Sequence, residues 1–214
     1  MADTLAYVHH AIRCAPRTSA TVADDLARLD WAGRGGTLFG LWRSQIGRPR
    51  DELNAITVWP AAASAGIAGS VLRGTANVEE VHSRPMQATL RPDSPQPPRR
   101  QGNYAFRWFE LPDAHWTEFL ALCADAWPGF ESAYDSQVIG LWRCTDDPAG
   151  RASALMMTRR PDLAMWERSK KPADAAEDEV RRKLSRRYDL CDATWVCTST
   201  LLTAEDQADT VRWA

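Results

Sequence analysis

A tetrapeptide, Gly-Leu-Trp-Arg, occurs twice in this chain of 214 residues, at positions 40–43 and 140–143. Each copy lies in an apolar, strand-like run that ends in a turn-forming segment, GRPRD after the first and DDPAGR after the second. A second strand-like run follows each turn, so each copy lies in the first strand of a predicted β-hairpin. The same motif at the same place in two hairpins favours a fold built from two similar halves.

A proline-rich segment separates the two halves. Residues 93–102 contain several prolines and no apolar period, which predicts an extended connector rather than a helix or strand. On this basis the chain divides into a first ferredoxin-like unit over residues 1–92, the connector, a second unit over 103–205 and a polar C-terminal tail over 206–214.

Both halves show the same order of predicted elements. A strand-like run, a helical stretch, the hairpin, further helical sequence and a final strand-like run follow one another in each. A small-residue helix is expected over residues 61–74 in the first half, and a helix that ends at a Pro-Gly pair over 112–129 in the second. The order β-α-β-β-α-β is typical of a ferredoxin-like unit, in which two helices cover one face of an antiparallel sheet.

The hairpin of the first half resembles the pattern of the NIPSNAP family, which belongs to the wider group of dimeric α/β-barrel proteins. The family's pattern is a Gly-x-aromatic segment, then a glycine turn, then an asparagine that opens the next strand. It corresponds here to Gly40, Trp42, Gly47 and Asn54.

The opening strand of the second half is also similar to the family, at Tyr104, Ala105, Arg107 and Phe109. The resemblance implies that two sheets pack face to face around a cavity, within one chain or between two. The expected fold class is therefore α+β, with two tandem ferredoxin-like βαββαβ repeats packed as a pseudodimeric α/β barrel. Members of the wider group include cofactor-free oxygenases of aromatic compounds and haem proteins.

The composition excludes several classes of partner and cofactor. Lys plus Arg (26) nearly balance Asp plus Glu (28), which argues against nucleic acid or a membrane surface as the main partner. Without a long apolar run, a cytoplasmic protein is expected. The five cysteines are scattered, and neither metal-ligand spacing nor a glycine-rich phosphate loop occurs, so we predict no metal site and no tightly bound cofactor.

Aromatic and glycine positions supply the candidate walls of a substrate site. The predicted wall residues are Gly40, Trp42, Trp59, Trp108, Gly140 and Trp142. If the face of the hairpin strand that carries Phe39 and Leu41 packs on helices, the tryptophan of each motif points into the barrel, and the neighbouring glycine leaves space for a ligand. The alternative is that the tryptophans only fill the space between the sheets.

Arg107 and His10 are the candidate catalytic residues. Arg107 lies in an aromatic strand, where a guanidinium needs either a carboxylate partner or an anionic substrate oxygen. Aligning Tyr7 with Tyr104 sets His10 opposite Arg107, and a side chain that titrates near neutral pH suits a base or proton shuttle. The alternative is structural: an internal ion pair for Arg107 and an unreactive position for His10.

The sequence thus predicts an enzyme of specialised or catabolic metabolism that acts on a small apolar or aromatic molecule inside the barrel. Cofactor-independent oxygenation, rearrangement or lyase cleavage would all suit such a site. Two alternatives stay open: a non-catalytic barrel that binds a small ligand or a protein, and a haem-binding barrel with His115 as axial ligand. His82 is a further candidate, and a homodimer is one option for the assembly.

Overall fold

The computed structural model describes residues 5–60 and 65–206 of the chain. The predicted C-terminal tail from 207 onward lies outside the described residues, as do residues 61–64, the start of the small-residue helix predicted over 61–74.

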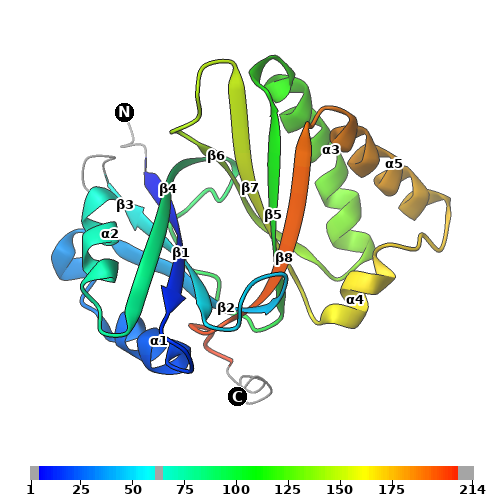
Figure 1. The fold of residues 1–214 in the computed structure, drawn as a ribbon. Coiled ribbons are helices and arrows are strands. Elements are labelled where there is room, and N and C mark those ends of the chain that lie inside the picture. Colours follow the sequence, from blue (N-terminus) through cyan, green and yellow to red (C-terminus); the bar gives the residue numbers. More distant parts are fainter. Residues whose placement is uncertain (1–4, 61–64, 207–214) are drawn as a thin grey trace.

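Eight antiparallel strands form one closed barrel, with the helices outside it (Figure 1). The strands of the first half are β1 (Ala6–Cys14), β2 (Thr37–Ile46), β3 (Glu52–Trp59) and β4 (Val78–Arg91). Those of the second half are β5 (Asn103–Pro112), β6 (Gln137–Cys144), β7 (Arg151–Arg160) and β8 (Ala193–Leu201).

The order of strands around the barrel is β1-β3-β2-β8-β5-β7-β6-β4. Within each half the order is the same, β4-β1-β3-β2 in the first and β8-β5-β7-β6 in the second. The pairs β2·β8 and β4·β6 join the two sheets, so the barrel closes within one chain. The predicted α+β fold class, with a β-α-β-β-α-β order in each half and an α/β barrel, is confirmed.

Helices cover the outside of both sheets (Figure 1). The helices are α1 (Ser19–Arg28), α2 (Ala65–Arg73), α3 (Trp116–Ala133), α4 (Leu163–Arg168) and α5 (Ala175–Asp189), with 3-10 turns η1 (Ala32–Arg34) and η3 (Asp113–His115). One apolar layer lies between the first-half sheet and α1 and α2, and another between the second-half sheet and α3 and α5.

Helix α3 continues beyond the predicted end at the Pro-Gly pair. It runs through Pro128 to Ala133. Phe130 and Tyr134, which follow the proline, are buried in the apolar layer against the second-half sheet. This packing outweighs the loss of one backbone hydrogen bond at the proline.

The two Gly-Leu-Trp-Arg motifs lie at equivalent β-bulges. The register of β2 against β3 shifts between Leu38 and Gly40, and that of β6 against β7 shifts between Val138 and Gly140. A bulge interrupts the alternation of side chains along a strand. Phe39, which alternation alone placed on the helix side, therefore lies in the cluster inside the barrel, and that part of the prediction is wrong.

The tryptophan of each motif is fully buried inside the barrel and packs across to the opposite half. The ring of Trp42 lies 5.9 Å from that of Tyr104 on β5, and the ring of Trp142 lies 5.8 Å from that of Tyr7 on β1. Residues from all eight strands join this cluster, so side chains fill the barrel interior. The packing alternative for the two tryptophans is the one that this geometry favours.

The glycine of each motif makes room for its own tryptophan. A Cβ atom on Gly40 would lie 2.3 Å from Cη2 of Trp42, and one on Gly140 would lie 2.3 Å from Cη2 of Trp142. The indole ring thus occupies the space that we expected to be left for a ligand, and that expectation is wrong.

The Gly40→Ala variant is expected to lose about 1–3 kcal/mol of unfolding free energy, because the new methyl group must displace a buried indole ring. Urea denaturation followed by tryptophan fluorescence measures the loss. The matched control is Gly66→Ala in α2, where an added Cβ meets no atom within 4 Å and no loss is expected. Equal stability of Gly40→Ala and the wild type would contradict the packing described here.

Candidate functional site

The two predicted catalytic residues lie on opposite outer faces of the barrel. His10 is fully buried on β1, on the same face as Val8 and Ile12, which pack in the layer under α1 and α2. Arg107 lies on the outer face of β5 and stacks on the ring of Tyr188 from α5, at 5.7 Å. The structure therefore does not bring His10 and Arg107 into one site.

Protein groups contact both ring nitrogens of His10. Nδ1 lies 2.8 Å from Oγ of Ser83, and Nε2 lies 3.0 Å from Oγ1 of Thr57. Burial, followed by the charges of His9 and Arg73, lowers the pKa of His10 to about 3. His10 is therefore neutral at physiological pH, and its environment favours the structural alternative.

Two other predicted wall residues, Trp59 and Trp108, lie in different layers. Trp59 is on the outer side of the first-half sheet, where it packs on Trp31 and donates a hydrogen bond to Oγ1 of Thr57 at 2.9 Å. Trp108 is inside the barrel, with its ring 5.2 Å from that of His9. The predicted wall residues thus do not enclose one common cavity with Arg107.

A cavity of about 210 Å³ lies on the outer face of the second-half sheet, beneath the helices. Arg107, Thr158 and Arg160 line its sheet side, and Trp127 from α3 and Tyr188 from α5 line its helix side. We call this cavity the outer pocket. It contains one predicted catalytic residue, Arg107, in a place different from the predicted barrel interior.

Basic side chains dominate the polar lining of the outer pocket. Five basic residues line it: Arg107, Arg160, Lys170, Arg181 and Arg187. Within the described residues, no carboxylate oxygen lies within ion-pairing distance of any of these five side chains. The internal ion pair proposed as the structural alternative for Arg107 is therefore not found among the described residues.

Aromatic rings and sulfur atoms contact these arginines instead. The guanidinium of Arg160 lies 5.1 Å from the ring centre of Phe130. That of Arg187 lies 5.0 Å from the ring centre of Phe109, and it donates to Sγ of Cys123 at 3.3 Å. Such contacts stabilise a cation weakly and leave its charge uncompensated.

The basic groups lower one another's proton affinity. Burial, with the charge of Arg107 as the second cause, lowers the pKa of Arg160 to about 10, so that Arg160 stays charged at neutral pH. Partial burial at the rim, followed by the charges of Arg107, Arg160 and Arg181, lowers the pKa of Lys170. The outer pocket is therefore a region of positive potential that favours an anion.

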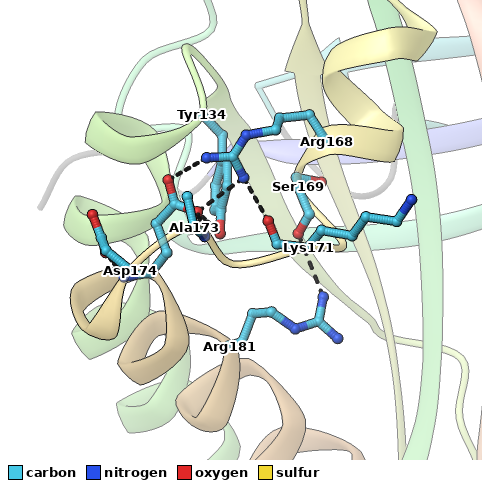
Figure 2. A network of polar contacts seen from close by, with 8 residues as sticks. Tyr134, Arg168, Ser169, Lys171, Ala173, Asp174 and Arg181 are labelled. Carbon is cyan, nitrogen blue, oxygen red and sulfur yellow. Dashed lines mark hydrogen bonds and ion pairs between the residues drawn. The ribbon is translucent and has the colours of Figure 1, made fainter.

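A network of polar contacts fixes the turn between α4 and α5 (Figure 2). The same turn carries Lys170, which lines the outer pocket. Arg168 donates to both carboxylate oxygens of Glu177, at 2.9 and 2.6 Å, and to the carbonyl of Lys171 at 2.6 Å. The backbone N–H of Ala173 donates to Glu177 at 2.7 Å. The hydrogen bonds from Arg168 and Ala173 hold the pKa of Glu177 below its usual value, so the network is charged at neutral pH.

The outer pocket does not fit a histidine-ligated haem. His115 does not line it, and Nδ1 of His115 lies 3.1 Å from the carbonyl oxygen of Leu190. His82 is exposed and contacts Glu80 at 2.8 Å. Across residues 5–60 and 65–206 there is no cluster of three or more metal-ligating side chains and no helix long and apolar enough to cross a membrane.

Sequence reasoning missed Arg160, Lys170 and Trp127 as site residues. Strand β7 pairs with β5 so that Met156 stands opposite Arg107 and Thr158 opposite Ala105, with Arg160 two residues further along β7. The alternation along "MMTRR" was therefore a usable signal for Arg160. The positions of Lys170 and Trp127 depend on how α3 and α4 pack, which no local pattern shows.

Comparisons with known proteins identify the fold of the chain but no family to which it belongs. No family model matches the chain, and no curated protein matches its sequence. An anthrone oxidase-like protein is similar in structure, with a TM-score of 0.64 and 11% identity over 94% of this chain and 92% of that one. A variant of chlorite dismutase from Candidatus Nitrospira defluvii has a TM-score of 0.62 and 9% identity over 92% and 90%.

A third similar structure is a protein from Lactobacillus acidophilus NCFM whose name provisionally classes it as a monooxygenase. Its TM-score is 0.56, with 9% identity over 94% of this chain and 97% of that one. At such low identity these similarities concern the fold alone. Over more than nine tenths of its length, the chain has the fold of the dimeric α/β-barrel proteins.

Proposed function

We propose that the protein is an enzyme that acts on a small aromatic molecule in the outer pocket of its second half, rather than inside the barrel. The observation that carries this proposal is a pocket lined by aromatic rings and by five basic side chains that lack carboxylate partners within the described residues, two of which, Arg160 and Arg187, are buried. Buried charge is costly without a counter-charge. A substrate that becomes negatively charged during its reaction supplies one.

Arg107 and Lys170 take different parts in the proposed reaction. Arg107 stabilises the oxyanion that forms when a phenolic or enolic substrate loses its proton to solvent, and Lys170 at the rim adds positive charge that favours this anion. In the oxygenase form of the proposal, the ring carbon para to the oxyanion transfers electrons to O₂, and a hydroperoxide forms there and loses water. For 1-naphthol the balance is one naphthol plus O₂ giving one naphthoquinone plus water.

The names of two structural neighbours support oxygenase chemistry, since one is called anthrone oxidase-like and the other is provisionally classed as a monooxygenase. The NIPSNAP-like motifs support the same broad group of barrels without naming a substrate. We retain cofactor-independent oxygenation as the preferred reaction, ahead of rearrangement and lyase cleavage.

Arg107→Met is expected to lower kcat/KM for oxygen uptake with 1-naphthol by roughly 100-fold, because one donor that stabilises the oxyanion is lost. An oxygen electrode measures the rate. The matched control is Arg182→Met on α5, because Arg182 is exposed and pairs with Asp178 and Glu179 outside the pocket. Unchanged turnover in Arg107→Met, or equal losses in both variants, would contradict the proposal.

A second candidate function is ligand binding without turnover. Among the described residues, the pocket lining contains no aspartate, glutamate or histidine, so its proton-transfer groups are few. Saturable binding of a phenol by calorimetry, together with no oxygen uptake and no chemical change in the phenol, would favour this candidate.

A further inference from the structure

The walls of the outer pocket contain buried hydrogen-bond donors that have no acceptor. Nε1 of Trp127, Nε of Arg160 and Nε of Arg187 are all buried without a partner within the described residues. The three residues are only 4%, 7% and 2% exposed. An unpaired buried donor is unfavourable, so a molecule that fills this pocket should offer acceptors.

The unpaired donors and the unpaired charges occur on the same side chains. Water could accept the hydrogen bonds of Arg160 and Arg187, but water does not balance their charge. An anion does both. Because a guanidinium matches the planar geometry of a carboxylate, a carboxylate is the anion that suits two neighbouring arginines best.

The other residues that line the pocket favour an anion that carries an aromatic ring. Helix α3 supplies Trp127 and Phe130, and Trp166 comes from α4. A dry cavity of about 150 Å³ in another protein holds benzene, so 210 Å³ has room for one or two rings. The sheet side thus supplies cations and the helix side supplies rings.

We infer that the outer pocket binds a small aromatic carboxylate of one or two rings, with Arg160 as the principal anchor of the carboxylate. The inference rests on the proposed function, because it specifies the substrate class of the same pocket. Arg107 then remains available for the phenolic or enolic oxygen that carries the reaction, so the two arginines hold two different oxygen groups.

Two probes of nearly equal shape test the inference in the intact protein by isothermal titration calorimetry: 1-hydroxy-2-naphthoate and its neutral amide, 1-hydroxy-2-naphthamide. The acid should bind at least about 10-fold more tightly than the amide, because hydrogen bonds to charged groups are the stronger ones. Arg160→Met should weaken binding of the acid by about 10- to 100-fold and change binding of the amide by only a few-fold. Arg182→Met should change neither.

Thermal unfolding without ligand separates a binding role for Arg160 from a structural one. The Arg160→Met variant should have a higher melting temperature than the wild type, because the substitution removes a buried charge that has no carboxylate partner. If Arg160 were purely structural, its replacement would instead lower the melting temperature of the protein. A lower melting temperature combined with unchanged affinity for the acid would overturn the role of Arg160.

The outcomes also separate this inference from the proposed function. If the acid and the amide bind with equal affinity while oxygen uptake with 1-naphthol is intact, the inference that the pocket recognises a carboxylate is overturned. The proposal that the pocket acts on an aromatic molecule then still stands. Absence of binding by both compounds, together with no uptake on 1-naphthol, overturns both proposals.

Discussion

Trp142→Ala is expected to lower the free energy of unfolding by about 3–5 kcal/mol, the range for loss of a large buried aromatic side chain. Trp142 is fully buried and contacts the rings of Tyr7 and Phe39 from the first half. The barrel strands surround the resulting cavity on all sides, so it can collapse only in part. Urea denaturation followed by circular dichroism measures the change.

The control for this prediction is Trp195→Ala. Trp195 is 41% exposed and stacks on Trp108 at the end of the barrel cluster, so its loss should cost no more than about 1.5 kcal/mol. Trp42→Ala should behave like Trp142→Ala, because the two residues occupy equivalent places. A loss in Trp142→Ala no larger than in Trp195→Ala would show that the barrel interior is loosely packed.

A shift from pH 7 to pH 5 is expected to destabilise the protein by about 4 kcal/mol through His9 and His10 together. Burial, opposed by the hydrogen bond that His9 makes to Oδ1 of Asn54, lowers the pKa of His9 to about 4, and burial lowers that of His10 to about 3. The unfolded chain takes up protons on both residues below about pH 6.5, whereas the folded chain does not. Stability therefore falls as the pH falls from about 6.5 towards 4.

Urea midpoints measured across this pH range test the prediction. His10→Gln should remove about half of the pH dependence whatever its effect on stability at pH 7, because only one buried imidazole then remains. The control is His82→Gln, since His82 lies with an exposed side chain beside Glu80. A pH dependence that stays the same in His10→Gln would mean that His10 is not buried in a neutral form.

The sequence predicted the fold well because hydrophobic periodicity and turn residues are local signals. The order of elements and both hairpins could be derived from such patterns. The β-bulge before Gly40 could not be predicted, because the alternation of side chains around Phe39 does not show where an extra residue interrupts the strand pairing. The continuation of α3 through Pro128 depends on burial of later residues, which is likewise non-local.

The candidate site was harder to predict than the fold. Arg107 could be identified because a charged residue stood among aromatic ones in a strand. Its partners in the outer pocket come from β7, α3 and the segment after α4, and only the closed barrel and its covering helices bring these together. His10 is the position equivalent to Arg107, but both residues lie on outer faces of the barrel, which point away from each other, so the two positions lie far apart.

The reciprocal contact of Trp42 with Tyr104 and of Trp142 with Tyr7 makes the junction between the halves isologous, as in a two-fold dimer. Each half offers the other an equivalent Trp and Tyr pair, so the first half of one chain could make these contacts with the second half of another chain. The connector over residues 93–102 selects the intramolecular pairing, because it keeps the two halves at a high effective concentration. A connector too short to span this junction would convert the same contacts into a domain-swapped dimer.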